Sequence, residues 1–134
     1  MSKHVQFIRE GNQVFAIVLR KKFCSPGVHF FTPGEFSQQF GLLVHQKGRI
    51  ISRHSHKLIR REVTRTQEVL VVLKGKLKIE IYNDKPKKLK TVILKAGDSI
   101  LLATGGHQVK IMEDAKIVEV KQGPYAGYDD KNYF

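Results

Sequence analysis

Alternation of apolar and polar side chains with a period of two is the sequence feature that most limits how this chain can fold. In the segment 76–82, Leu77, Ile79 and Ile81 alternate with charged residues, so one face of an extended chain is apolar and the other is charged. Helical periodicity is nearly absent from the 134 residues. We expect further strands over residues 14–19, 40–45, 69–73, 91–94, 99–102, 108–112 and 116–121.

Residues that favour turns separate these predicted strands. They occur at residues 25–27, 32–34, 47–48, 74–75, 83–86, 96–98, 105–106 and 113–114. Short strands at roughly regular spacing favour a closed sandwich or barrel, and a length of 134 residues suits one domain with its own core. The sequence therefore predicts a single all-β domain.

The cysteine content and the distribution of apolar residues indicate the cellular compartment of the protein. Cys24 is the single cysteine and cannot form a disulfide within the chain, which indicates a reducing compartment. Residues 1–10 contain no apolar stretch long enough for a signal peptide, and the longest apolar run, 69–73, is far too short to span a bilayer. We therefore expect a cytoplasmic protein without a membrane partner.

The net charge of +12 at pH 7 would attract either nucleic acids or anionic small molecules. The sequence has no helix-turn-helix periodicity, no aromatic stacking signature on a strand and no zinc-finger spacing. We therefore expect an anionic small-molecule ligand, with nucleic acid as the less favoured alternative. A basic surface that only faces solvent is an equally open interpretation of the charge in residues 47–65. Much of the charge lies in residues 47–65, named here the basic segment, whose basic residues are Lys47, Arg49, Arg53, Lys57, Arg60, Arg61 and Arg65.

Two of the six histidines, His54 and His56, are two residues apart. If this part of the chain is a strand, both imidazoles lie on the same face of the sheet. Two imidazoles side by side inside a barrel indicate either a metal site or a costly pair of buried polar groups. The spacing alone leaves both interpretations open, because exposed strands also carry such pairs.

A wider pattern surrounds this pair. Gly48 is followed by five residues and then His54, Glu68 is followed by six residues and then Gly75, and a further segment runs from Gly97 to His107. These pieces resemble the two signature motifs of the cupin superfamily and cover residues 48 to about 111. The resemblance implies a double-stranded β-helix, a jelly-roll-like barrel of two antiparallel sheets. It also implies one divalent metal ion whose ligands are His54, His56, Glu68 and His107.

The sequence departs from the cupin motifs in several places. Eleven residues separate His56 from Glu68, where the general motif has three or four, and Glu62 stands closer to the usual offset. Glu68 is preferred because its distance to the following glycine matches the motif. The second motif has Ala103 in place of the usual proline and Ile111 in place of the usual asparagine.

The resemblance also carries expectations about chemistry. Three imidazoles and one carboxylate suit Fe, Mn, Co, Ni, Cu or Zn, and an open coordination position would allow Lewis-acid chemistry. Residues 66–70, 105–107 and 120–125 resemble a group of short, largely uncharacterised cupins that often accompany polysaccharide or sugar-nucleotide genes. This implies a small anionic ligand derived from a carbohydrate. Arg60 and Arg61 are the candidate ligand-binding residues, because guanidinium groups suit forked binding of phosphate or carboxylate.

Whether the protein is an enzyme or a ligand-binding sensor stays open at this point. If no metal binds, related sugar-nucleotide ketoisomerases imply that His54 or His56 acts as a catalytic base. We expect one cupin domain over residues 1–134, with an N-terminal arm and edge strands over 1–35, a barrel core over 36–122 and a C-terminal tail over 123–134. We also expect a homodimer, because cupins are commonly dimers and exposed strand edges favour pairing. The side chains expected to line the barrel around the metal are those of Leu70, Val72, Val109 and Ile111.

Overall fold

The computed structural model describes residues 3–134, except for the side chains of residues 128 and 129. The predicted all-β class is confirmed, because the helical structure in the described residues is limited to one 3-10 turn, η1, at Gly127–Asp130. The strands are β1 (Val5–Glu10), β2 (Gln13–Leu19), β3 (Gly27–Phe30), β4 (Gly41–Val44), β5 (Glu68–Tyr82), β6 (Lys88–Lys95), β7 (Ser99–Leu102) and β8 (Gly106–Lys121).

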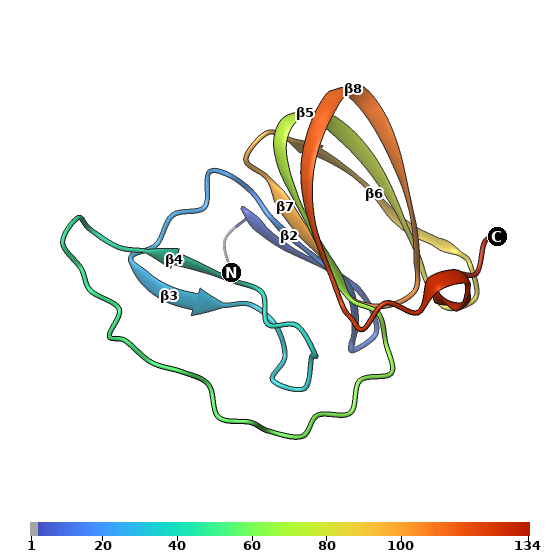
Figure 1. Ribbon diagram of the computed structural model, residues 1–134. Coiled ribbons are helices and arrows are strands. Elements are labelled where there is room, and N and C mark those ends of the chain that lie inside the picture. The colour runs from blue at the N-terminus through green and yellow to red at the C-terminus, as the bar shows by residue number, and fades with distance from the viewer. Residues whose placement is uncertain (1–2) are drawn as a thin grey trace.

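Six of the strands form one antiparallel sheet, in the order β1-β2-β7-β5-β6, with β8 paired to β5 off this path. β3 and β4 form a separate two-stranded sheet. The larger sheet curls, because β1 and β6 stand at opposite ends of the strand order yet contact each other. Figure 1 shows β5 and β8 arching together over the top of the molecule. The result is a half-barrel of curled antiparallel strands, and the finer expectation of a cupin double-stranded β-helix stays a prediction.

Strand β2, which lies between β1 and β7, is buried on both of its faces. Ala16 and Val18 belong to the core cluster enclosed by the curled sheet. Ile17 and Leu19 belong to a second cluster on the outer face, where Phe40 from the β3–β4 layer packs against them. Burial on both faces explains why the sequence of β2 is a continuous apolar run and not an alternating one. Each apolar side chain buried in this way contributes about 1.5–3 kcal/mol to the stability of the fold.

The alternation of buried and exposed residues in β5 shifts by one position at Gly75. Leu70 and Val72 are buried before this point, and Leu77 and Ile79 are buried after it. The β5–β8 pairing is irregular between residues 72 and 77, which identifies a β-bulge. Gly75 has a φ of +91°, and a Cβ there would collide with the backbone carbonyl of Asp114.

Two predicted turns are therefore wrong. The expected turns at 74–75 and 113–114 lie opposite each other inside the continuous strands β5 and β8. The residue that suggested the first turn is a glycine with positive φ, and a bulge uses the same backbone conformation as a turn.

The expected lining of the barrel is correct only in part. Leu70 and Val72 are buried, and Val109 is partly buried against the same core. The expectation for Ile111 is wrong, because its side chain is 52% exposed. Ile111 pairs with the buried Leu77 and shares its face, but β8 pairs only with β5 in the described part of the chain, so the half-barrel is open beside Ile111.

Candidate metal and ligand site

Polar side chains gather on the inner face of the half-barrel at one end of β5 and β8. Residues directly opposite each other in an antiparallel ladder share a face of the sheet. Glu119 is opposite the buried Leu70, and Lys121 is opposite Glu68. These three charged residues therefore face the same side as the core, and together they form a polar end to an otherwise apolar interior.

His107 joins this group from the other end of the ladder. It is opposite the buried Ile81, so its side chain also lies on the inner face. Its Nε2 atom lies 3.0 Å from Oε1 of Glu68, and the two side chains are 31% and 13% exposed, respectively. Two of the four residues predicted as metal ligands are thus in direct contact.

The contact with His107 affects the charge of Glu68. The hydrogen bond from His107 is the main reason that the pKa of Glu68 is lowered from 4.5 to about 2, and it outweighs the opposing effect of burial. Glu68 is therefore ionised at neutral pH. Glu119 shows the opposite behaviour: its pKa is raised, mainly because it hydrogen-bonds with Glu68. The inner face thus holds one firmly ionised carboxylate and a second that takes up a proton more readily.

Lys121 adds a positive charge to the same site. Its Nζ atom lies 2.9 Å from Oδ2 of Asp130, which belongs to η1. The hydrogen bond with Asp130 is the main reason that the pKa of Lys121 is raised, and that of Asp130 is lowered by the same contact. The hydroxyl of Thr66 also donates to Asp130, over 3.4 Å.

A cavity of about 690 Å³ opens beside the Glu68–His107 contact. Glu68 and His107 lie on one of its walls, and residues 130–134 form another. The ring of Phe134 meets Tyr82 edge-on, with ring centroids 5.3 Å apart. A volume of this size lies within the usual range for small-molecule sites, of roughly 300–1,000 Å³.

The other two predicted ligands are not part of this site. Within the described residues there is no strand between Val44 and Glu68, so His54 and His56 lie on an exposed, extended stretch of the basic segment. Their ring centroids are 5.3 Å apart, and Nδ1 of His54 lies 2.7 Å from the backbone oxygen of Ser52. Among the residues that the structure describes, no group of three or more His, Cys, Asp or Glu side chains could hold a metal ion.

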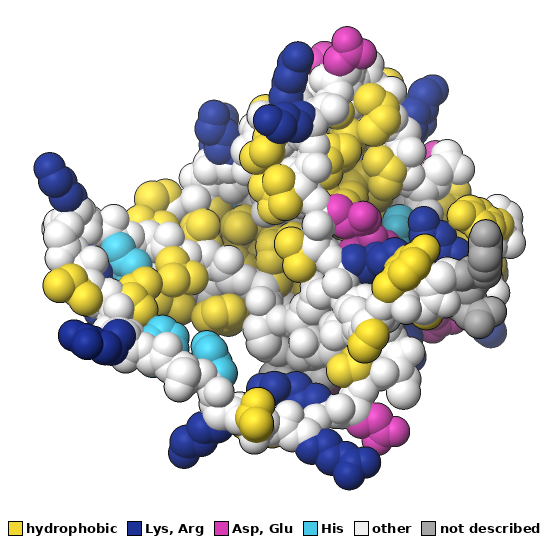
Figure 2. Space-filling view, in the orientation of Figure 1, with side chains coloured by type: hydrophobic (Ala, Val, Ile, Leu, Met, Phe, Trp, Pro, Cys, Tyr) yellow, Lys and Arg dark blue, Asp and Glu magenta, His cyan; other side chains and the backbone are white. Residues whose placement is uncertain are grey.

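The basic segment runs outside both sheets. It is the green trace below the strands in Figure 1, and Figure 2 shows Lys, Arg and His side chains spread along it. Arg60 and Arg61, the predicted ligand-binding residues, are exposed. In the described part of the chain, none of the basic side chains of this segment forms an ion pair, while Arg65 donates to the hydroxyl of Thr104.

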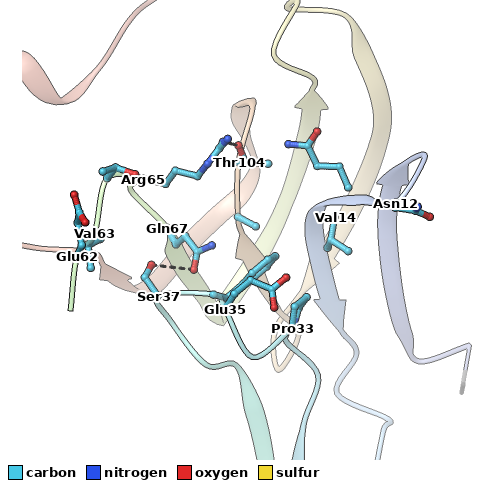
Figure 3. Close-up of a pocket in the computed structure, with 14 residues that line it drawn as sticks. Asn12, Val14, Pro33, Glu35, Ser37, Glu62, Val63, Arg65, Gln67 and Thr104 are labelled. Atoms are coloured by element: carbon cyan, nitrogen blue, oxygen red, sulfur yellow. Dashed lines mark hydrogen bonds between the residues drawn. The ribbon is translucent and has the colours of Figure 1, made fainter. Parts of the chain in front are cut away.

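A second cavity, of about 340 Å³, lies where the basic segment returns to the sheet. Figure 3 shows Arg65 reaching toward Thr104, and the hydrogen bond of 3.3 Å from Ser37 to Gln67. Gln67 is buried and also accepts a hydrogen bond from the backbone of Gln38. These contacts anchor the end of the basic segment against the sheet. Glu62, the alternative predicted ligand, lines this second cavity and not the one beside His107.

Sequence reasoning missed Glu119, Lys121 and Asp130. The alternation of residues 117–121 contains a signal for Glu119 and Lys121, because these two charged residues occupy the alternate positions of the strand that face the core. No comparable signal marks Asp130, because its contact with Lys121 depends on the path of the tail after β8.

Comparison with protein-family models, with curated proteins and with solved structures finds no match in any of the three. The cupin resemblance therefore stays a prediction that rests on the sequence motifs. Among the described residues, no helix combines the length and the apolar character that a membrane crossing requires.

Proposed function

We propose that the protein binds a divalent metal ion, and with it a small anionic ligand, at the inner site formed by Glu68 and His107. The observation that carries this proposal is the direct contact between these two side chains beside a cavity. An ionised carboxylate and an imidazole are both common ligands of divalent transition metals. Two donors are too few for a stable site, so further ligands have to reach the same place.

His54 and His56 are the proposed further ligands. In the part of the chain that the structure describes, β8 pairs only with β5, so its other edge offers unpaired backbone groups next to His107. Such an edge readily accepts another strand. The basic segment suits this role because few of its backbone groups are paired. Among the described residues, its single hydrogen bond between backbone groups runs from the amide of Arg49 to the carbonyl of Gln46. The stretch from His56 to Glu68 can span up to about 40 Å, which leaves the segment free to reach β8.

Pairing with β8 would have two further consequences. It would place both imidazoles on one face of the new strand, and it would cover the exposed side chain of Ile111. It would also carry Arg60 and Arg61 toward the mouth of the site, where their guanidinium groups could bind a phosphate or carboxylate. A carbohydrate-derived ligand is proposed on the cupin resemblance alone, and the function proposed is binding, with no reaction assigned.

Cobalt titration tests this proposal, because bound Co²⁺ has a visible spectrum that reports its ligands. We expect about one Co²⁺ per chain, and at least about tenfold weaker binding in His107→Ala, in Glu68→Gln and in the double variant His54→Ala/His56→Ala. His29→Ala and His45→Ala are matched controls, and they should bind Co²⁺ like the wild type. Equal Co²⁺ binding by the wild type and His107→Ala would reject the site.

Limited trypsin digestion tests the movement of the basic segment separately. Trypsin should cut the metal-free protein first after the exposed Arg60 or Arg61. Added Co²⁺ should slow this cut in the wild type but not in His54→Ala/His56→Ala. A cut that is unaffected by bound Co²⁺ would leave metal binding standing and would remove His54 and His56 from the ligand set.

A further inference from the structure

We propose that Lys121 binds the anionic oxygen group of the ligand, and that the carboxylate of Asp130 occupies that position until the ligand displaces it. This inference rests on the proposed function for the place where the ligand binds. The contact between Lys121 and Asp130 is independent of it.

The position of Lys121 favours this role. It lies directly opposite Glu68 in the β5–β8 ladder, so its side chain is next to the Glu68–His107 contact and on the same face. The Lys121 side chain is 26% exposed, so its ammonium group can be reached without unfolding the sheet. Among the described residues, Lys121 does not itself line the cavity beside His107, but its partner Asp130 does. A ligand in this cavity therefore reaches the ammonium group by taking the place of the Asp130 carboxylate.

Asp130 stands where such a ligand would bind. Asp130 lines the cavity. One of its carboxylate oxygens accepts a hydrogen bond from the ammonium of Lys121, and the other accepts one from the hydroxyl of Thr66. One cation and one neutral donor are the groups that a bound phosphate or carboxylate would use. The Asp130 carboxylate thus imitates the anion that we propose as ligand.

Residues 130–134, which carry this carboxylate, form a strap over the cavity. Besides the Asp130 ion pair, the strap is held by Phe134, which packs on Tyr82 and lies close to Gly106. Ion pairs near the surface add little to stability, so a free anion can compete with Asp130 for Lys121. Lys131 also lines the cavity and adds a second positive charge near the same point.

The alternative is that Lys121 and Asp130 form a permanent clasp that only fixes the tail. The two interpretations differ in the effect of removing the Asp130 charge. A clasp loses an attachment when Asp130 is neutralised, and anion binding does not improve. An occupied anion site loses its competitor, and anion binding becomes tighter.

Binding of inorganic phosphate and of acetate, followed by NMR chemical shifts of backbone amides in residues 119–122, distinguishes the two. We expect Asp130→Asn to bind at least one of these anions about tenfold more tightly than the wild type, and Lys121→Met to lose that binding. Lys121→Arg should retain it, and this separates loss of charge from misfolding. Lys116→Met, on the same strand and exposed, is the matched control and should leave binding unchanged. A preference for phosphate or for acetate identifies the group that the site takes.

The proposal is overturned if Asp130→Asn binds neither anion more tightly than the wild type, or if Lys121→Met binds as well as the wild type. Cobalt titration of the same variants separates this result from the fate of the metal site. Lys121→Met and Asp130→Asn should both still bind about one Co²⁺ per chain, because neither residue is a proposed metal ligand. A wild type that binds no Co²⁺ while the phosphate results hold would reject the metal site and retain the anion site.

Discussion

The Nε2 atom of His107 lies 3.0 Å from the Oε1 atom of Glu68, although the strand ladder places these residues far apart. In the pairing of β5 with β8, His107 is opposite Ile81 at one end, and Glu68 is opposite Lys121 at the other. The curl of the two strands closes this separation. The contact is therefore tertiary, and both partners lose it when the sheet unfolds.

Stability at acid pH should depend on Glu68. Its pKa falls from 4.5 to about 2 on folding, so its contribution is present above pH 4.5 and is lost as the pH falls from about 4.5 to 2. We expect the urea midpoint of the wild type to fall more between pH 5 and pH 3 than that of Glu68→Gln. Glu113→Gln, an exposed control on β8, should behave like the wild type. Equal losses in Glu68→Gln and the wild type would contradict the assignment.

Gly75 and Gly48 offer a matched pair, because both have a φ of +91°. At Gly48 a Cβ would meet no atom within 4 Å, whereas at Gly75 it would collide with the backbone of Asp114. Gly48→Ala should cost about 1 kcal/mol of unfolding free energy from backbone strain, and Gly75→Ala about 3 kcal/mol. Urea denaturation measures both, and similar losses would show that the bulge has room for a side chain.

Asp98 should be among the polar residues that matter most for stability. It is buried, and its carboxylate accepts hydrogen bonds from the backbone of Lys21 and Lys95 and from the guanidinium of Arg20. Asp98→Ala leaves these donors without a partner and should destabilise the protein by about 3 kcal/mol. The exposed Asp84→Ala is the control and should change the melting temperature little. A small effect at Asp98 would mean that water replaces the carboxylate.

Two isoleucines separate the contribution of the core from that of the basic segment. Ile79 is fully buried in the inner cluster, and Ile59 is 61% exposed. Ile79→Ala should lower the unfolding free energy by about 2–5 kcal/mol, and Ile59→Ala by less than about 0.5 kcal/mol in the metal-free protein. A large loss from Ile59→Ala in that form would show that the basic segment already packs against another surface.

Much of the fold follows from local patterns in the sequence. The alternation in residues 76–82 predicted the second half of β5, and the apolar run at 14–19 predicted β2. The glycine at 75 was misread because a bulge and a turn use the same backbone conformation. β1 and β3 were expected only as edge strands without bounds within residues 1–35, because residues 5–10 and 27–30 are short segments.

The candidate site could be predicted only where spacing carries the information. Glu68 and His107 were singled out by motif spacing, and the structure brings them into contact. The register of the β5–β8 pairing determines that Lys121 lies opposite Glu68, and the path of the tail determines that Asp130 joins Lys121. Neither of these tertiary features is visible in a local pattern.

The burial of β2 on both faces has a consequence for how the protein opens. The outer cluster rests on Ile17 and Leu19, so the β3–β4 layer needs β2 in place. The inner cluster is closed by other strands and does not need that layer. Amide hydrogen exchange should therefore be hierarchical, with β3 and β4 exchanging through a partial opening and β2 only through global unfolding. The shared strand makes the outer layer a subordinate unit, which can detach and return while the curled sheet persists.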